Sequence, residues 1–180
     1  MNLRNAAIRT GLEALYFSGA FRLLGPVSAG IGTIFTMHHV RPPRDDAFQP
    51  NALLEIEPAF LETLIEYLRY KKVDIVSLDE VHRRLSEQDY HNRFVAFTFD
   101  DGYRDNLEYA WPILKKHGVP ATLFIATSFP DRLGELWWVA LERAVAATDR
   151  IAMEVSAASR FLDSNNPAAK ARAYVAGLAG

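Results

Sequence analysis

In the stretch FVAFTFDDG, a short apolar run leads directly into two adjacent carboxylates. Val95, Phe97 and Phe99 are β-branched or aromatic, and the run is short, so it predicts a buried β-strand. Asp100 and Asp101 follow at its end. Two neighbouring carboxylates there repel each other and lose hydration unless a positive charge lies between them. The stretch therefore indicates a metal-ion site at the end of a buried strand.

The composition limits the classes of protein to consider. A chain of 180 residues with 49% hydrophobic and 23% charged residues is typical of one soluble globular domain, with or without an appendage. A net charge of −2 gives no electrostatic support for a nucleic-acid partner. The chain has no cysteine, which excludes disulfides and thiolate metal sites.

Strand and helix patterns alternate along the chain, which predicts an α/β fold of parallel units with right-handed crossovers. The expected strands number about four or five, fewer than the eight of a closed barrel. The expected strands are 33–37, 73–78, 94–99, 119–127 and 151–157, and the expected helices are 58–68, 79–85, 105–117, 136–147 and 166–175.

Local signals set several of these boundaries. Pro58 suits the first turn of a helix, and Asp79 is expected to cap the next one. Pro112 predicts that helix 105–117 is kinked or begins later, and Gly118 is expected to end it. The residues expected on the buried side of that helix are Leu107, Ala110, Trp111 and Leu114.

Residues 1–28 are predicted to form an amphipathic helix separate from a domain at 29–180. Charged residues interrupt its apolar run, so it is not a convincing signal peptide, and the chain is expected in the cytoplasm. Three arginines outnumber one glutamate, so residues 3–24 are compatible with peripheral contact at the inner membrane surface. Packing against the domain is the favoured interpretation. The apolar face comprises Ile8, Leu12, Leu15, Tyr16 and Leu23.

The segment around the aspartates resembles the TFDDG signature of the NodB-type polysaccharide deacetylases. The resemblance extends over about residues 33–129 and is closest to the branch that acts on poly-N-acetylglucosamine or chitooligosaccharides. The matching segments are Thr36–Val40, Phe97–Asn106, Ala110–Leu114 and Gly118–Phe124.

This resemblance implies a partial (β/α) barrel that lacks its C-terminal strands. It also implies a hydrolase that removes acetyl groups from an N-acetylglucosamine polymer or oligomer. The family holds a divalent cation, often zinc, with one aspartate and two histidines, and the cation activates a water molecule. By position Asp100 is the catalytic base and Asp101 the metal ligand. His38, Tyr103 and Arg104 are expected to line the substrate pocket.

The family's His-x-x-x-His motif is missing, because no two of the five histidines are four residues apart. We expect the chain to be a fragment of a longer deacetylase; the alternative is a whole protein that has lost the site. Among the remaining histidines, His39 is expected at the surface beside Arg41. His82 and His117 are expected at exposed helix positions, and His91 in a loop.

Two other functions remain open. The first is a deacetylase-like protein that binds carbohydrate without catalysis, as the missing histidines suggest. The second is Mg²⁺-dependent phosphoryl transfer, since paired aspartates after a strand also serve that chemistry. No glycine-rich phosphate loop supports the second. Trp137 and Trp138 could bind a sugar ring, but two tryptophans within a helical pattern more often anchor a core, and that interpretation is favoured.

Overall fold

The computed structural model describes residues 3–28, 30–155 and 158–178. Its centre is a four-stranded parallel sheet, which confirms the α/β prediction. One edge of β5 pairs with β1 along its whole length, and the other edge pairs with β4 at its start and β6 at its end. The strands are β1 (Gly32–Met37), β4 (Asp74–Ile75), β5 (Phe94–Phe99) and β6 (Ala121–Leu123).

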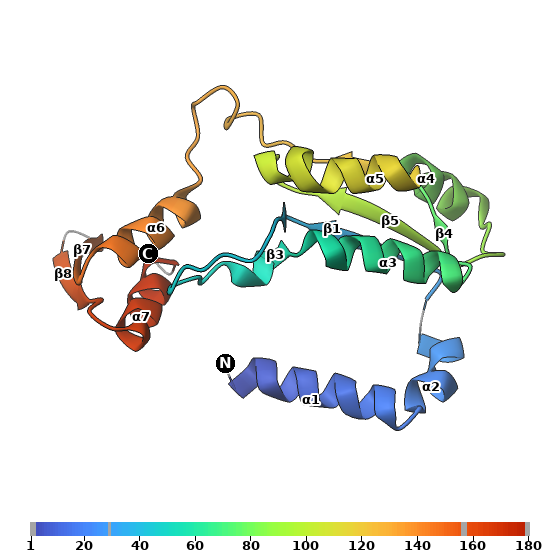
Figure 1. Cartoon of the computed structure of the whole chain (residues 1–180), viewed down its shortest axis with the longest axis horizontal. Helices are drawn as coiled ribbons and strands as arrows, with labels where there is room; N and C mark the ends of the chain where they lie inside the picture. Colours follow the sequence, from blue (N-terminus) through green and yellow to red (C-terminus); the bar gives the residue numbers. More distant parts are fainter. Residues whose placement is uncertain (1–2, 29, 156–157, 179–180) are drawn as a thin grey trace.

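Every residue of β5 is buried, as predicted for this strand. Its odd-numbered side chains enter the main core, which also contains Leu61 and Ile65 from one helix and Leu114 from another. Phe94 and Ala96 lie on the opposite face and pack with Val76 and Val81. Helices α3 (Pro58–Tyr70) and α5 (Trp111–His117) therefore cover one face of the sheet, and α4 (Leu78–Glu87) covers the start of the other (Figure 1).

The helices beside the sheet begin where local chemistry allows. Pro58 occupies the first turn of α3, as predicted. The prediction for Asp79 was wrong: Ser77 caps α4, because its side chain accepts a hydrogen bond from the backbone N–H of Glu80. Asp79 lies inside the first turn instead. These helices are α3 (Pro58–Tyr70), α4 (Leu78–Glu87) and α5 (Trp111–His117).

The chain from 105 to 117 is not one regular helix. A π-helical turn, η2 (Asn106–Ala110), precedes α5, and Pro112 lies in the first turn of α5, so the predicted interruption is confirmed. The π turn changes the helical phase. Ala110 and Leu114 are buried as expected, but Leu107 and Trp111 are 68% and 53% exposed. Gly118 ends α5 in a left-handed conformation, as predicted.

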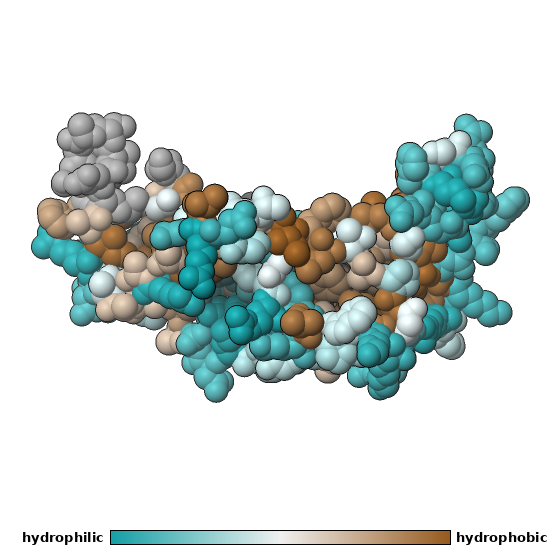
Figure 2. All heavy atoms as spheres, turned by 90° about the horizontal axis from the view of Figure 1, so that it is seen from above, coloured by the Kyte–Doolittle hydropathy of each residue, from teal (hydrophilic) through white to brown (hydrophobic). Residues whose placement is uncertain are grey.

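Two of the expected strands are shorter than the apolar runs that predicted them. Pairing within 73–78 is limited to β4, and pairing within 119–127 is limited to β6. Two residues of β6, Ala121 and Leu123, are exposed, so that strand is not buried as predicted. Apolar side chains thus reach the surface, and Figure 2 shows such brown patches among polar residues on the face seen from above.

The C-terminal part forms a separate group of elements beyond a long irregular connection (Figure 1). The predicted helices are present, and so is the first strand, although the end of its predicted range, 156–157, lies outside the described residues. The second strand of an antiparallel hairpin was not predicted, because 158–163 lacks a long apolar run. Val145 and Tyr174 are the centre of a small core between its two helices. The elements are α6 (Trp137–Ala147), β7 (Arg150–Val155), β8 (Ala158–Asp163) and α7 (Pro167–Leu178).

The N-terminal segment contains two helices rather than one: α1 (Leu3–Phe17) and α2 (Ala20–Ser28). Gly19, with φ of +71°, makes the turn between them, which a side chain would strain. The prediction that this segment packs on the domain was wrong: α1 and α2 lie apart from the sheet (Figure 1), and the large apolar side chains whose burial is described there are exposed. The expected boundary at residue 29 lies outside the described residues.

None of the helices in the described part of the chain is long and apolar enough to cross a membrane. Peripheral membrane contact through 3–24 stays a prediction. The exposed apolar residues of α1 and α2 are Ile8, Leu12, Leu15, Tyr16, Phe17, Phe21 and Leu23.

Candidate functional site

Asp100 and Asp101 lie at the carboxyl end of β5, between the ends of β1 and β6. The backbone N–H of Asp100 donates to the carbonyl of Met37, and that of Phe124 donates to the carbonyl of Phe99. These bonds continue the sheet to its edge on both sides. Reactive groups collect at such edges of parallel sheets.

A cavity of about 610 Å³ opens beside the two carboxylates. Side chains alternate between the faces of a strand, so Thr98 and Asp100 share the face opposite the main core. Thr36 of the neighbouring strand joins them, and its hydroxyl lies 3.4 Å from that of Thr98. The cavity is therefore polar near the carboxylates. Its apolar lining consists of Ile34, Leu78, Phe124, Ile125 and Ala126.

The turn after β5 has an unusual backbone conformation. Asp101 has a φ of +68° and Gly102 a φ of +70°, so two consecutive residues are left-handed. Aspartate tolerates this conformation better than most residues, and glycine adopts it freely. A Cβ at Gly102 would lie 3.2 Å from a methyl carbon of Ile125. The turn therefore needs glycine both for its backbone angle and for its close approach to the segment that follows β6.

The residues beside Asp101 do not complete a metal site. A catalytic zinc site uses at least three protein ligands. Among the described residues, the histidine and carboxylate side chains that gather closely enough to hold a cation are Glu62, Glu66 and His117, and Asp101 is not among them. Among the residues that the structure describes, the aspartate pair is thus not part of a complete ligand set.

His39 is the residue whose environment was most clearly mispredicted. Its side chain is buried, not at the surface, and its Nδ1 donates to Asp105 Oδ2 at 2.7 Å. The imidazole also lies against the ring of Tyr103, with the ring centroids 3.6 Å apart. Trp138 Nε1 in turn donates to the hydroxyl of Tyr103 at 2.8 Å. A connected polar and aromatic group therefore begins two residues after the aspartate pair.

Burial raises the pKa of Tyr103 to about 12, and the negative charge of Asp101 adds to this increase. Tyr103 therefore remains a neutral hydroxyl at ordinary pH. The Tyr103 hydroxyl oxygen accepts a hydrogen bond from Trp138, and the hydroxyl proton can be donated in a second hydrogen bond.

The predicted pocket residues do not share one cavity. Tyr103 and Arg104 line a second, larger cleft of about 1150 Å³, together with His39 and Trp138. The residues that line the cavity of the aspartate pair do not include His38, whose backbone carbonyl accepts from Asn106 Nδ2 at 2.9 Å. Trp138 lines the cleft and Trp137 is 52% exposed, so the core interpretation of this pair was wrong.

Charged groups hold the far wall of the large cleft. Arg44 donates to Glu55 at 2.7 Å and to Glu142 of α6 at 2.8 Å. Asn51 also donates to Glu142, at 2.8 Å. Burial opposes ionisation of Glu55, but hydrogen bonds from Arg41 and Arg44 outweigh it and hold the pKa of Glu55 below its usual value. This network ties the C-terminal helices to the loop that follows β2 (His39–Val40).

Residues 87–153 match the family model described as polysaccharide deacetylase. A stretch of 31 residues is 58% identical to the putative polysaccharide deacetylase YxkH of Bacillus subtilis, and it covers 17% of this chain and 11% of that protein.

A solved structure supports the same assignment. The deacetylase PplD of Streptococcus pyogenes, determined in complex with acetate, is 27% identical with a TM-score of 0.50. The match covers 56% of this chain and 44% of the PplD chain, so the present sequence spans less than half the length of that relative. The predicted resemblance is confirmed: residues 87–153 of this chain match the model of the polysaccharide deacetylase family.

Proposed function

We propose that this chain contributes the aspartate pair of an enzyme that hydrolyses N-acetyl groups on an N-acetylglucosamine polymer or oligomer. The observation that carries this proposal is the pair itself, two adjacent carboxylates at the end of a fully buried strand beside a cavity of about 610 Å³. The family match over residues 87–153 supports it. So does the acetate bound by PplD, because acetate is the other product of such a reaction.

In the proposed reaction the two aspartates have different roles. Asp100 shares a face with Thr98 and accepts the proton of the water that attacks the acetamide carbonyl. Asp101, held in the left-handed turn, is the carboxylate offered to a divalent cation such as zinc. The described residues do not gather three metal ligands around Asp101, so a cation there requires ligands from elsewhere.

A second candidate function is glycan binding without hydrolysis. The incomplete ligand set beside Asp101 favours it. The large cleft gives such binding a location, because Trp138 and Tyr103 line it and aromatic rings pack well on sugar faces. The two candidates differ in one measurable respect, since only the first releases acetate.

Acetate release from N-acetylglucosamine oligomers tests the proposal, measured with the protein in zinc-supplemented and in EDTA-treated buffer. Asp100→Asn is expected to lower the rate by about 10²–10⁴-fold, the usual contribution of a general base. Asp131→Asn, at an exposed aspartate, is the matched control and should leave the rate unchanged.

Each alternative outcome identifies a different function. Oligomer binding without acetate release, unchanged in Asp100→Asn, supports the glycan-binding candidate and overturns the hydrolase. Equal acetate release by the wild type and Asp100→Asn would remove Asp100 from the mechanism. Hydrolysis of p-nitrophenyl phosphate in place of acetate release would favour Mg²⁺-dependent phosphoryl transfer.

A further inference from the structure

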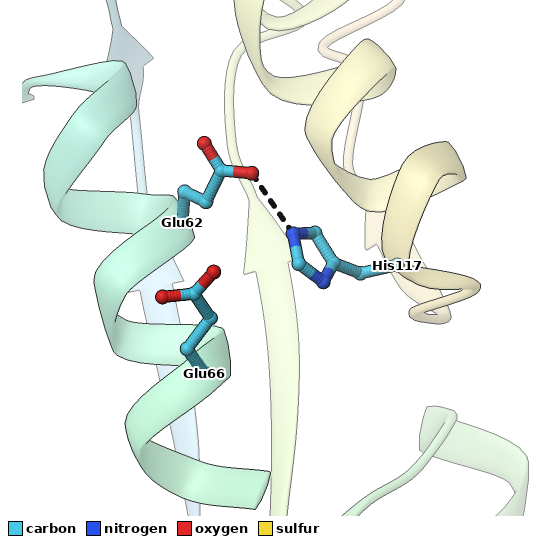
Figure 3. A group of neighbouring side chains, drawn as sticks. All are labelled: Glu62, Glu66 and His117. Carbon is cyan, nitrogen blue, oxygen red and sulfur yellow. Dashed lines mark hydrogen bonds and ion pairs between the residues drawn. The ribbon is translucent and has the colours of Figure 1, made fainter.

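A second group of metal-ligating side chains lies on the helices that cover the sheet, away from the aspartate pair. Glu62 and Glu66 are one turn apart on α3, and His117 is the last residue of α5. Figure 3 shows the Glu62 carboxylate directed from α3 toward the imidazole, with the Glu66 carboxylate beside it on the same helix. One oxygen of each glutamate and one ring nitrogen of His117 all lie within 4.8 Å of one another.

The group brings two like charges together on one helix face. Glutamates at positions i and i+4 repel each other and destabilise a helix unless a positive charge compensates. Lys116 compensates here, because its Nζ donates to Glu62 Oε1 at 2.7 Å. The Lys116 side chain is 67% exposed, whereas that of His117 is only 12% exposed. The compensating lysine is therefore free to move, and the imidazole is not.

We propose that Glu62, Glu66 and His117 bind a divalent cation of the zinc class, at a site distinct from Asp101. Ligands on a tetrahedral zinc lie about 3.3–3.4 Å apart, so small side-chain rotations from the observed arrangement are enough. Two carboxylates and one imidazole leave a fourth position for water. Because its ligands come from α3 and α5, the bound cation would cross-link the two helices that pack on the core face of β5.

Two positively charged side chains, those of Lys116 and Arg69, compete with the cation. His117 Nε2 lies 3.0 Å from Glu62 Oε1, the same oxygen that accepts from Lys116, so a cation must replace both contacts. Arg69 lies beside the ring and donates to the backbone carbonyl of His117. Its Nη1 is also 3.4 Å from His117 Nδ1, and that contact must lengthen when Nδ1 carries the proton. Removal of the Lys116 charge should therefore strengthen cation binding.

Calorimetric titration of the full chain with zinc chloride tests this site. Glu66→Gln removes one ligand but keeps the hydrogen bonds that Lys116 and His117 make with Glu62. It is expected to weaken zinc binding by at least about tenfold. Lys116→Met is expected to tighten it. Zinc at about a hundredfold excess over Kd should raise Tm by about 5–10 °C, and Glu66→Gln should reduce this increase.

Two matched variants separate this site from the proposed active site. Glu135→Gln, at an exposed glutamate outside the cluster, should leave zinc binding unchanged. The zinc-binding event that Glu66→Gln weakens should persist in Asp101→Asn. Zinc binding that survives Glu66→Gln but is lost in Asp101→Asn would overturn the proposal. Absence of zinc binding by the wild-type chain would overturn it as well. Acetate release, which depends on Asp100, is measured independently, so either proposal can fail alone.

Discussion

The chain holds two groups of carboxylates, and it positions them by different means. Asp100 and Asp101 are fixed by the backbone: a fully buried strand precedes them, and a left-handed turn contains Asp101. Glu62 is held by side-chain contacts from α5, among them an ion pair to the exposed Lys116, and Glu66 lies exposed one turn later on α3.

This difference matters for function. A group positioned by the backbone keeps its place whether or not a ligand is present, which suits a base that must meet a reacting water molecule. A group positioned by flexible side chains rearranges easily, which suits a site that closes on a cation and stabilises the fold. We therefore expect the strand end that carries Asp100 and Asp101 to tolerate changes in its backbone and in the core poorly. The cluster of Glu62, Glu66 and His117, the helix cluster, should respond mainly to changes in charge.

The largest effect on stability is expected from Phe97→Ala. Phe97 is 1% exposed and stacks on Phe35, with the ring centroids 5.8 Å apart. Its removal leaves a cavity beneath the strand that carries the aspartates and should lower the free energy of unfolding by about 3–5 kcal/mol. Urea unfolding measures this, with Leu107→Ala, at a 68% exposed residue, as the apolar control. A loss in Phe97→Ala no greater than in the control would show that the strand end does not depend on the core.

A smaller effect is expected from the turn. Gly102→Ala imposes a left-handed conformation on alanine and brings its Cβ within 3.2 Å of Ile125, which should cost about 1–3 kcal/mol. Gly118→Ala is the matched control: its φ is +56°, but no atom lies within 4 Å of a Cβ there. Thermal unfolding of both variants separates the cost of the angle from that of the contact. Equal losses would show that Ile125 moves aside and does not constrain the turn.

The sequence predicted best the features that depend on neighbouring residues. The buried strand before Asp100 and the stop at Gly118 were both evident, because period-two apolar residues and glycine act within a few positions. Pro112 was correctly expected to interrupt its helix. The π turn that accommodates it was not foreseen, and for that reason Leu107 and Trp111 were placed on the wrong side.

Contacts between distant segments were missed. His39 was expected at the surface, yet its partner Asp105 lies 66 residues away, and the pair buries both side chains. His117 was expected to be exposed, but Glu62, 55 residues earlier, lies against it. A histidine beside charged residues gives no local sign of either partner. The one available signal was Asp105 itself, an aspartate shortly after the strand end whose presence the pattern of apolar residues did not explain.

The smallest effect on stability is expected when Glu62 of the helix cluster is titrated with acid. Hydrogen bonds from Lys116 and His117 hold the pKa of Glu62 below its usual value of 4.5. A carboxyl with a lower pKa in the folded state stabilises the fold above its unfolded pKa. This contribution disappears as the pH falls through the lower, folded value. Tm measured in EDTA from pH 6 to pH 3 should therefore fall more for the wild type than for Glu62→Gln.

Glu66→Gln is the control for that titration, because it keeps both hydrogen bonds of Glu62 and should retain most of the wild-type dependence on pH. Sodium chloride at pH 7 should reduce the difference in Tm between the wild type and Glu62→Gln, since exposed ion pairs are screened. If Glu62→Gln follows the wild-type curve at every pH, apolar packing between α3 and α5 holds the cluster rather than charge. The helix cluster would then be as rigid as the strand end, and the contrast between the two regions would not hold.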